Sequence, residues 1–103
     1  MSKYNSKITE VGGIKFHSKK ESIRYQELVL LERAASIRDL RLQVKYSLDV
    51  NGVHICNYIA DFVYHDYRYE KTIVEDSKGV RTDVFKLKSK LMKAIHNIDI
   101  LET

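Results

Sequence analysis

Two aspartates stand inside stretches that otherwise have the composition of buried strands. Asp61 interrupts the apolar run Tyr58–Tyr64, and Asp76 lies within Val74–Gly79, whose sequence is V-E-D-S-K-G. Side chains alternate along a strand, so Asp76 and Lys78 should point to one face. Carboxylates that lie close together repel each other, and burial adds to that cost, which a bound divalent cation relieves. The two aspartates therefore predict a site for Mg²⁺ or Mn²⁺.

A cation held in this way suits the hydrolysis of phosphodiesters. Mg²⁺ prefers hard oxygen ligands, usually one or two carboxylates with waters and a substrate phosphate completing the shell. It polarises a phosphoryl oxygen and makes a bound water acidic. A lysine two residues from a ligand, as Lys78 is from Asp76, can orient that water or stabilise charge developing on the phosphorane. Asp61, Asp76 and Lys78 are thus the minimum set for this chemistry.

Each of these residues also has an ordinary structural interpretation. Asp61 could be an edge-strand charge that discourages aggregation. Asp76 and Lys78 could form a surface ion pair before a turn. Glu21 could serve only in a capping box with Ser18 at the start of a helix. The functional interpretation rests on the conjunction of all of them, since one mechanism requires every position.

A helix expected from Ser18 to about Ala35 supplies Glu21, the third acidic residue. Its residues are good helix formers, and its apolar positions recur at helical spacing. Glu21 projects onto the same side as that apolar face, where burying an unpaired carboxylate would be costly, so this position suggests a function. The predicted apolar face is Leu28, Leu31 and Ala35, flanked by Tyr25, and the predicted solvated face is Ser22, Gln26 and Arg33.

Three strands should follow this helix. Residues 40–48 alternate between apolar and polar types, and Asn51-Gly52 predicts a hairpin into a second strand over about 53–64. A third strand is expected over about 70–78 after a polar turn. If the second and third strands pair, Asp61 and Asp76 lie side by side at one end of the sheet.

A second helix is expected over 82–95, followed by a short strand over 98–101. Thr82 or Asp83 should cap the helix and Asn97 should stop it, and the predicted apolar stripe is Val84, Leu87, Leu91 and Ile95. Residues 1–13 are expected to be a polar lead-in, with a short strand near 14–16, and residues 14–103 a single domain. The element order α-β-β-β-α-β predicts a mixed α/β fold.

Charge indicates a nucleic-acid partner. The chain of 103 residues has 18 basic and 14 acidic residues, a net charge of +4. The basic residues gather within 15–24, 38–45 and 78–93, beside the carboxylates, and could follow a DNA backbone without reading sequence. No apolar run is long enough to span a membrane, and the lone Cys56 fits a reducing, cytoplasmic location. The predicted DNA-binding residues are Lys19, Lys20, Arg24, Lys45, Arg81, Lys86, Lys88 and Lys90.

The same stretches carry a resemblance to a known superfamily. The chain resembles the PD-(D/E)xK nucleases, and within them small phage-encoded endonuclease-like proteins, with Holliday-junction resolvases and transposase nuclease subunits as wider relatives. Ala60 stands where the name-giving proline often is. The matching stretches cover about 75 residues in the superfamily's order: H-S-K-K-E-S-I-R-Y (17–25), L-Q-V-K-Y (42–46), Y-I-A-D-F (58–62), V-E-D-S-K-G (74–79) and T-D-V-F-K-L-K-S-K-L (82–91).

The resemblance implies a restriction-endonuclease-like fold and a role for each residue. Asp61 would be the shared metal ligand, Asp76 the (D/E) residue and Lys78 the lysine. Glu21 would be an outer acidic ligand, and Gln43, together with Lys45 in a Q-x-K pattern, would point from the first strand toward the site. The activity implied is a divalent-metal-dependent endodeoxyribonuclease, structure-selective for junction or branched DNA, acting as a homodimer in phage DNA recombination or processing in a bacterial host.

Two other functions stay open on the sequence. One is a catalytically inactive nuclease-fold protein that binds DNA as an accessory factor. The other is a protein-binding module with Tyr58, Tyr64, Tyr67 and Tyr69 on its surface, although aromatic residues that alternate along strands more often pack in the core.

Overall fold

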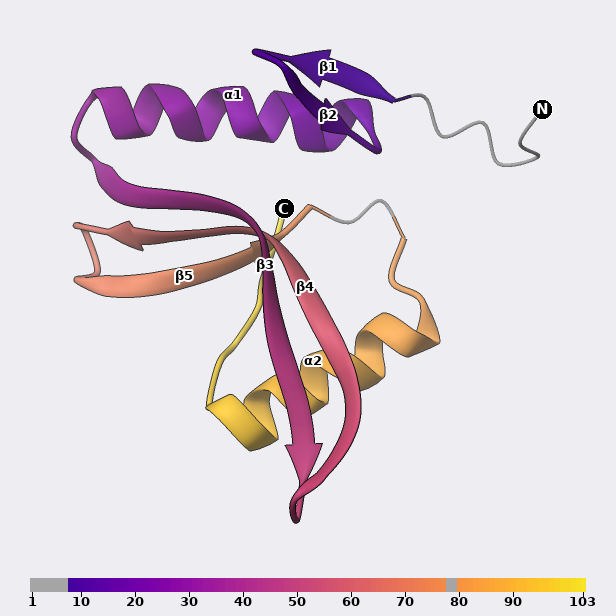
Figure 1. Cartoon of the computed structure of the whole chain (residues 1–103). Helices are drawn as coiled ribbons and strands as arrows, with labels where there is room; N and C mark the ends of the chain where they lie inside the picture. Colours follow the sequence, from indigo (N-terminus) through magenta and orange to yellow (C-terminus); the bar gives the residue numbers. More distant parts are fainter. Residues whose placement is uncertain (1–7, 78–79) are drawn as a thin grey trace.

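The computed structural model describes residues 8–77 and 80–103, and these form an α/β fold (Figure 1). The predicted order α-β-β-β-α-β is confirmed, and a β-hairpin precedes it. Within the described residues the elements are β1 (Thr9–Val11), β2 (Ile14–Phe16), α1 (Lys19–Arg33), β3 (Ile37–Val50), β4 (Val53–Asp66), β5 (Lys71–Asp76), α2 (Asp83–His96) and β6 (Leu101–Glu102).

The larger sheet has the strand order β3-β4-β5-β6 and is mixed. β3 and β4 form the predicted antiparallel hairpin, whose turn residues Asn51 and Gly52 both have positive φ, 51° and 78°. β5 runs antiparallel to β4, as expected, and β6 runs parallel to β5. This pairing brings the ends of β4 and β5 together.

The apolar core consists of two clusters on opposite faces of the sheet. In one, which we call the α1 cluster, Leu28 of α1 and Phe16 of β2 pack with Phe62. In the other, the α2 cluster, Phe85 and Met92 of α2 pack with strand residues that include Val63. Figure 1 accordingly shows α1 beside β1 and β2, and α2 against the lower part of β3 and β4.

Along the hairpin of β3 and β4, the side chains that pack in the core switch from one face of the sheet to the other at one position. Leu42 pairs with Phe62 and both belong to the α1 cluster, whereas Val44 pairs with Ala60 and both belong to the α2 cluster. Residues two apart on a regular strand share a face. The alternation must therefore break between them, where Gln43 has a φ of +52°.

Helix α1 begins where predicted but buries a different set of residues. Ser18 caps it, accepting from the backbone N–H of Glu21 at 3.1 Å. Leu28 is buried as expected, but Ser22, predicted to be solvated, is 1% exposed. Burial costs it little, because its hydroxyl donates to the Lys19 carbonyl at 2.7 Å. Ala35 lies beyond the helix with a φ of 60°.

Helix α2 has the predicted limits, and of its predicted apolar stripe Leu91 and Ile95 pack against the α2 cluster, whereas the first half of the stripe does not. Thr82 is its N-cap and Asn97 its left-handed C-cap. Val84 and Leu87 are 62% and 58% exposed, while Phe85 and Met92 are buried. Both sets have helical spacing, and the larger Phe85 ring takes the core position, 6.4 Å from the ring of Tyr58. In the first turns of α2, the sequence pattern therefore predicted the wrong side of the helix to be buried.

The hairpin of β1 and β2 extends the fold into residues expected to be a lead-in. The strand at 14–16 is confirmed, and β1 pairs with it in the register Val11↔Ile14. Gly12 and Gly13 have φ values of 57° and 83°, so both adopt the left-handed conformation that a two-residue hairpin turn needs. The last strand, predicted over 98–101, is shorter and lies further along the chain: β6 overlaps the prediction only at Leu101.

Candidate functional site

Asp61 and Asp76 lie side by side where β4 and β5 meet. The register pairs Phe62 with Glu75, and its continuation by one residue places Asp61 opposite Asp76. An oxygen of Asp61 accepts from the backbone N–H of Ser77 at 2.9 Å, which holds this carboxyl at the end of β5. Asp76 is buried. The juxtaposition predicted from hairpin pairing is confirmed.

The surroundings of Asp61 raise its pKa to about 7. Burial is the largest cause, since it disfavours the charged carboxylate, and the N–H of Ser77 opposes it. The negative charges of Asp76 and Glu21 add to the rise, as does a hydrogen bond between the carboxyl groups of Asp61 and Asp76. Burial, together with the neighbouring carboxylates, therefore makes the ionised state of Asp61 costly.

Glu21 reaches this cluster from the first turn of α1. It is buried, and its carboxylate accepts from the side-chain amide of Gln43 at 3.2 Å. Gln43 belongs to β3, so α1 is tied to the position where the hairpin changes face. A non-glycine residue at positive φ within a strand is strained, and such strain concentrates at functional sites.

Tyr58 is a site residue that the sequence did not predict. Its hydroxyl donates to Asp76 at 2.6 Å, and both side chains are buried. Burial, followed by the hydrogen bond to Asp76, raises the pKa of Tyr58. The available signal was position: Tyr58 opens the same apolar run that Asp61 interrupts.

The four tyrosines considered as a partner surface do not form one. Tyr58 and Tyr64 are buried, and each donates its hydroxyl to a carboxylate, Asp76 in one case and Glu75 in the other. Tyr67 and Tyr69 are exposed. The hypothesis of a surface built from all four is therefore wrong.

The chemistry of the donor set fits a cation held by two carboxylates. Over residues 8–77 and 80–103, His, Cys, Asp and Glu side chains make no group of three or more that could hold a metal ion. The predicted trio of Asp61, Asp76 and Glu21 is thus not assembled as a set of direct ligands. Asp61 and Asp76 meet, and the negative charge of Glu21 raises the pKa of Asp61. Mg²⁺ commonly takes one or two carboxylates, so the pair suffices.

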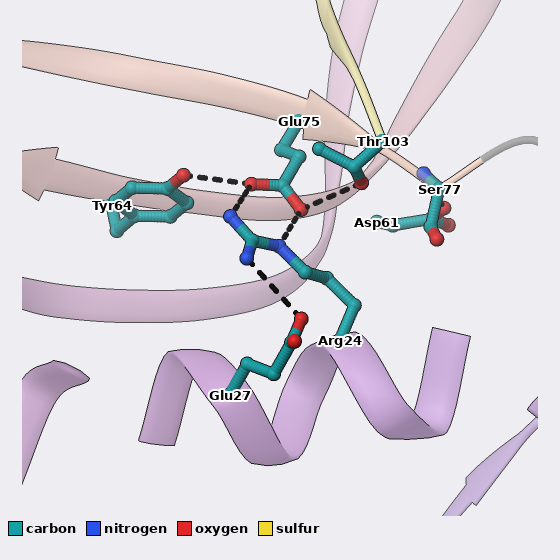
Figure 2. A network of polar contacts seen from close by, with 7 residues as sticks. All are labelled: Arg24, Glu27, Asp61, Tyr64, Glu75, Ser77 and Thr103. Atoms are coloured by element: carbon teal, nitrogen blue, oxygen red, sulfur yellow. Dashed lines mark hydrogen bonds and ion pairs between the residues drawn. The ribbon is translucent and has the colours of Figure 1, made fainter. Parts of the chain in front are cut away.

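Glu75, next to Asp76 in sequence, points to the opposite face and joins a buried network (Figure 2). Its side chain is 0% exposed. Arg24 donates to it from Nε at 2.6 Å and from a terminal nitrogen at 3.0 Å. Tyr64 and Thr103 donate their hydroxyls to the same carboxylate at 2.7 and 3.0 Å. The hydrogen bond and charge of Glu75 raise the pKa of Arg24.

The predicted DNA-binding residues fall into different surroundings. Arg24 is held by Glu75 and by Glu27, which accepts at 3.3 Å, so each of its three side-chain nitrogens donates to a carboxylate of the protein. Arg81 pairs with Glu102 at 3.0 Å. Lys19 and Lys20 line a cleft of about 400 Å³, which Ser77, the residue after Asp76, also lines. The other predicted lysines lie on β3 and α2: Lys45, Lys86, Lys88 and Lys90.

Lys78, the predicted catalytic lysine, lies outside the described residues. In the part of the chain that the structure describes, no helix is long and apolar enough to cross a membrane.

Comparisons with known proteins identify a family. A search of curated proteins and a search of solved structures each found no match. A family model, described as a protein of unknown function (DUF1064), matches residues 1–100. Because this match covers nearly the whole chain, the protein belongs to the DUF1064 family.

Proposed function

We propose that this protein is a divalent-metal-dependent endodeoxyribonuclease of the PD-(D/E)xK type. The observation that carries the proposal is the meeting of Asp61 and Asp76 at the ends of two paired strands, with Glu21 close enough to raise the pKa of Asp61. Elements far apart in sequence would not assemble buried like charges without a compensating partner. The resemblance of the motif stretches points to the same chemistry.

Each residue has a role in this proposal. Asp61 and Asp76 would hold Mg²⁺ or Mn²⁺, and the cation, when bound, supplies Lewis-acid activation of the phosphate. Tyr58 fixes Asp76 by donating to one of its oxygens. Gln43 orients Glu21, the outer acidic residue. Lys78 is proposed to stabilise charge that develops at the phosphate.

DNA is the proposed substrate because two lysines line a cleft that reaches Ser77, the residue after Asp76. Lys19 and Lys20 line the cleft beside Ser77, whose N–H is bonded to Asp61. Such contacts hold a phosphate backbone and make binding depend on salt. Selectivity for junction or branched DNA, a homodimer and a role in phage DNA recombination are further parts of the proposal.

The test is cleavage of labelled duplex, single-stranded and four-way-junction DNA with Mg²⁺ or Mn²⁺. We expect Asp76→Asn and Lys78→Ala to abolish cleavage while DNA binding is retained. Asp99→Asn is the matched control, because Asp99 is 81% exposed and pairs only with Lys93 among the described residues. Binding without cleavage of any substrate by the wild type would instead identify a nuclease-fold accessory protein. Cleavage that survives Asp76→Asn would refute the assignment of the site.

A further inference from the structure

The network around Glu75 joins α1 to the strand that carries Asp76. Glu75 and Asp76 are neighbours on β5 and point to opposite faces of the sheet. Arg24 comes three residues after Glu21 on α1, and residues three apart lie on one face of a helix. Figure 2 shows this ion pair crossing from helix to strand. In the sequence, Arg24 is within one helical turn of Glu21, and Glu75 directly precedes Asp76.

The contact has the geometry of a rigid clamp. The Arg24 guanidinium meets both carboxylate oxygens of Glu75, at 2.6 and 3.0 Å, and a two-point contact of this kind fixes orientation as well as distance. Tyr64 from β4 and Thr103 occupy the remaining acceptor positions of Glu75. Thr103 also donates its backbone N–H to the carbonyl of Asp76 at 3.0 Å. Both residues of the β5 end are held from several sides.

We propose that Arg24 and Glu75 are positioning residues, which set the location of Glu21 relative to Asp61 and Asp76 by locking α1 onto β5. This inference rests on the proposed function, because it assigns the pair to the same cation site. It differs from a purely structural ion pair in one respect. On this inference, the effect of breaking the pair on the cation site passes through Glu21.

The experiment is a double-mutant cycle between Glu75→Gln and Glu21→Gln. Glu75→Gln keeps the size of the side chain and removes its charge, and Arg24→Lys keeps the charge and removes the two-point contact. The readouts are Mn²⁺ affinity by calorimetry, kcat and KM for DNA cleavage, and thermal unfolding of each variant. Glu27→Gln is the matched control, since Glu27 is the exposed partner of Arg24, at 57% exposure.

Glu75→Gln and Arg24→Lys should each weaken Mn²⁺ binding and lower kcat by about tenfold or more, the usual effect of residues behind metal ligands. KM for DNA should stay within about twofold, and Glu27→Gln should behave as wild type. In the Glu21→Gln background the same substitutions should have an effect of less than about twofold, because coupled residues are not additive.

Several results would overturn the inference. Equal losses in both backgrounds would show that the pair acts on the fold alone, and unchanged kcat and Mn²⁺ affinity would show that it does not act on the site. Either leaves the nuclease proposal standing. If the wild type binds Mn²⁺ but does not cleave DNA, the double-mutant cycle measured on Mn²⁺ affinity still tests the inference. A wild type that neither cleaves nor binds Mn²⁺ removes the proposed function, and the inference with it.

Discussion

At the scale of single residues, Gln43 combines an unfavourable backbone conformation with a contact to the candidate site. Its φ of +52° is in the left-handed region, which glycine enters freely and other residues enter at a cost of about 1 kcal/mol or more. Its side chain holds Glu21. Residues in regular strands rarely adopt this conformation, and such strained conformations cluster at functional sites.

Gln43→Gly should separate stability from activity. Relief of the strain offsets the loss of the Glu21 contact, so the free energy of unfolding should stay within about 1 kcal/mol of wild type. DNA cleavage should fall, because Glu21 loses its hydrogen bond. Urea unfolding and the cleavage assay measure the two effects. Lys45→Gly, two residues further along β3, is the control for stability and should destabilise by roughly 0.5–1 kcal/mol.

Asp61 should make the metal-free protein less stable as pH rises. Its folded-state pKa is about 7, whereas an unfolded aspartate titrates near about 3.9. The folded state therefore binds the proton more tightly between these values. The stabilisation is full below about pH 4 and is lost as pH rises through about 7.

Asp61→Asn removes this titration. Thermal unfolding in EDTA should show a smaller fall in Tm from pH 5 to pH 8 for Asp61→Asn than for wild type. At pH 8 the variant should be the more stable of the two. Asp99→Asn, at an exposed carboxylate, should follow the wild-type curve. Identical pH profiles for Asp61→Asn and wild type would contradict the raised pKa.

At the scale of elements, the buried side of α2 gives a direct test of the packing. Met92→Ala should destabilise by about 3 kcal/mol, because Met92 is fully buried in the α2 cluster. Leu87→Ala, on the same helix but 58% exposed, should change the free energy of unfolding by less than about 0.5 kcal/mol. Chemical denaturation of both variants measures the difference. If both variants lost a comparable free energy of unfolding, Leu87 would be a core residue, as its spacing in the sequence predicts.

Local patterns predicted the elements and the meeting of the two aspartates. Alternation over 40–48 and the Asn51-Gly52 turn indicate a hairpin directly, and pairing of the next strand follows from the short connection. The strands thus bring Asp61 and Asp76 together without information from distant parts of the chain. Glu21 was found because a carboxylate beside an apolar helix face is unusual.

The remaining features depend on contacts that sequence patterns do not contain. The apolar positions of β3 alternate without interruption through Gln43, so the change of face leaves no trace in them. From the sequence, Glu75 resembles a solvent-exposed glutamate next to Asp76. Its partner Arg24 lies 51 residues away. Arg24 was predicted to bind DNA because a basic residue in a basic cluster gives no sign of an internal partner.

At the scale of the whole molecule, addition of Mg²⁺ should stabilise the folded chain. A ligand that binds only the folded state raises its stability by about 2.7 kcal/mol at 100 times its Kd. Tm should therefore rise with Mg²⁺ concentration for wild type and for Asp99→Asn. Asp61→Asn and Asp76→Asn should show no such rise. A rise shared by all four proteins would indicate binding elsewhere.

The change of face at Gln43 also means that strands β3 and β4 serve two clusters, which we expect to open with different free energies. Leu48 and Tyr58 belong to one cluster, Leu28 and Phe62 to the other, and continuous strands β3 and β4 connect them. Native-state hydrogen exchange should then resolve two opening free energies, one for each cluster. Asp61 lies at the boundary between them. A cation held there would make opening of either cluster release it, so Mg²⁺ should merge the two transitions into one cooperative unfolding.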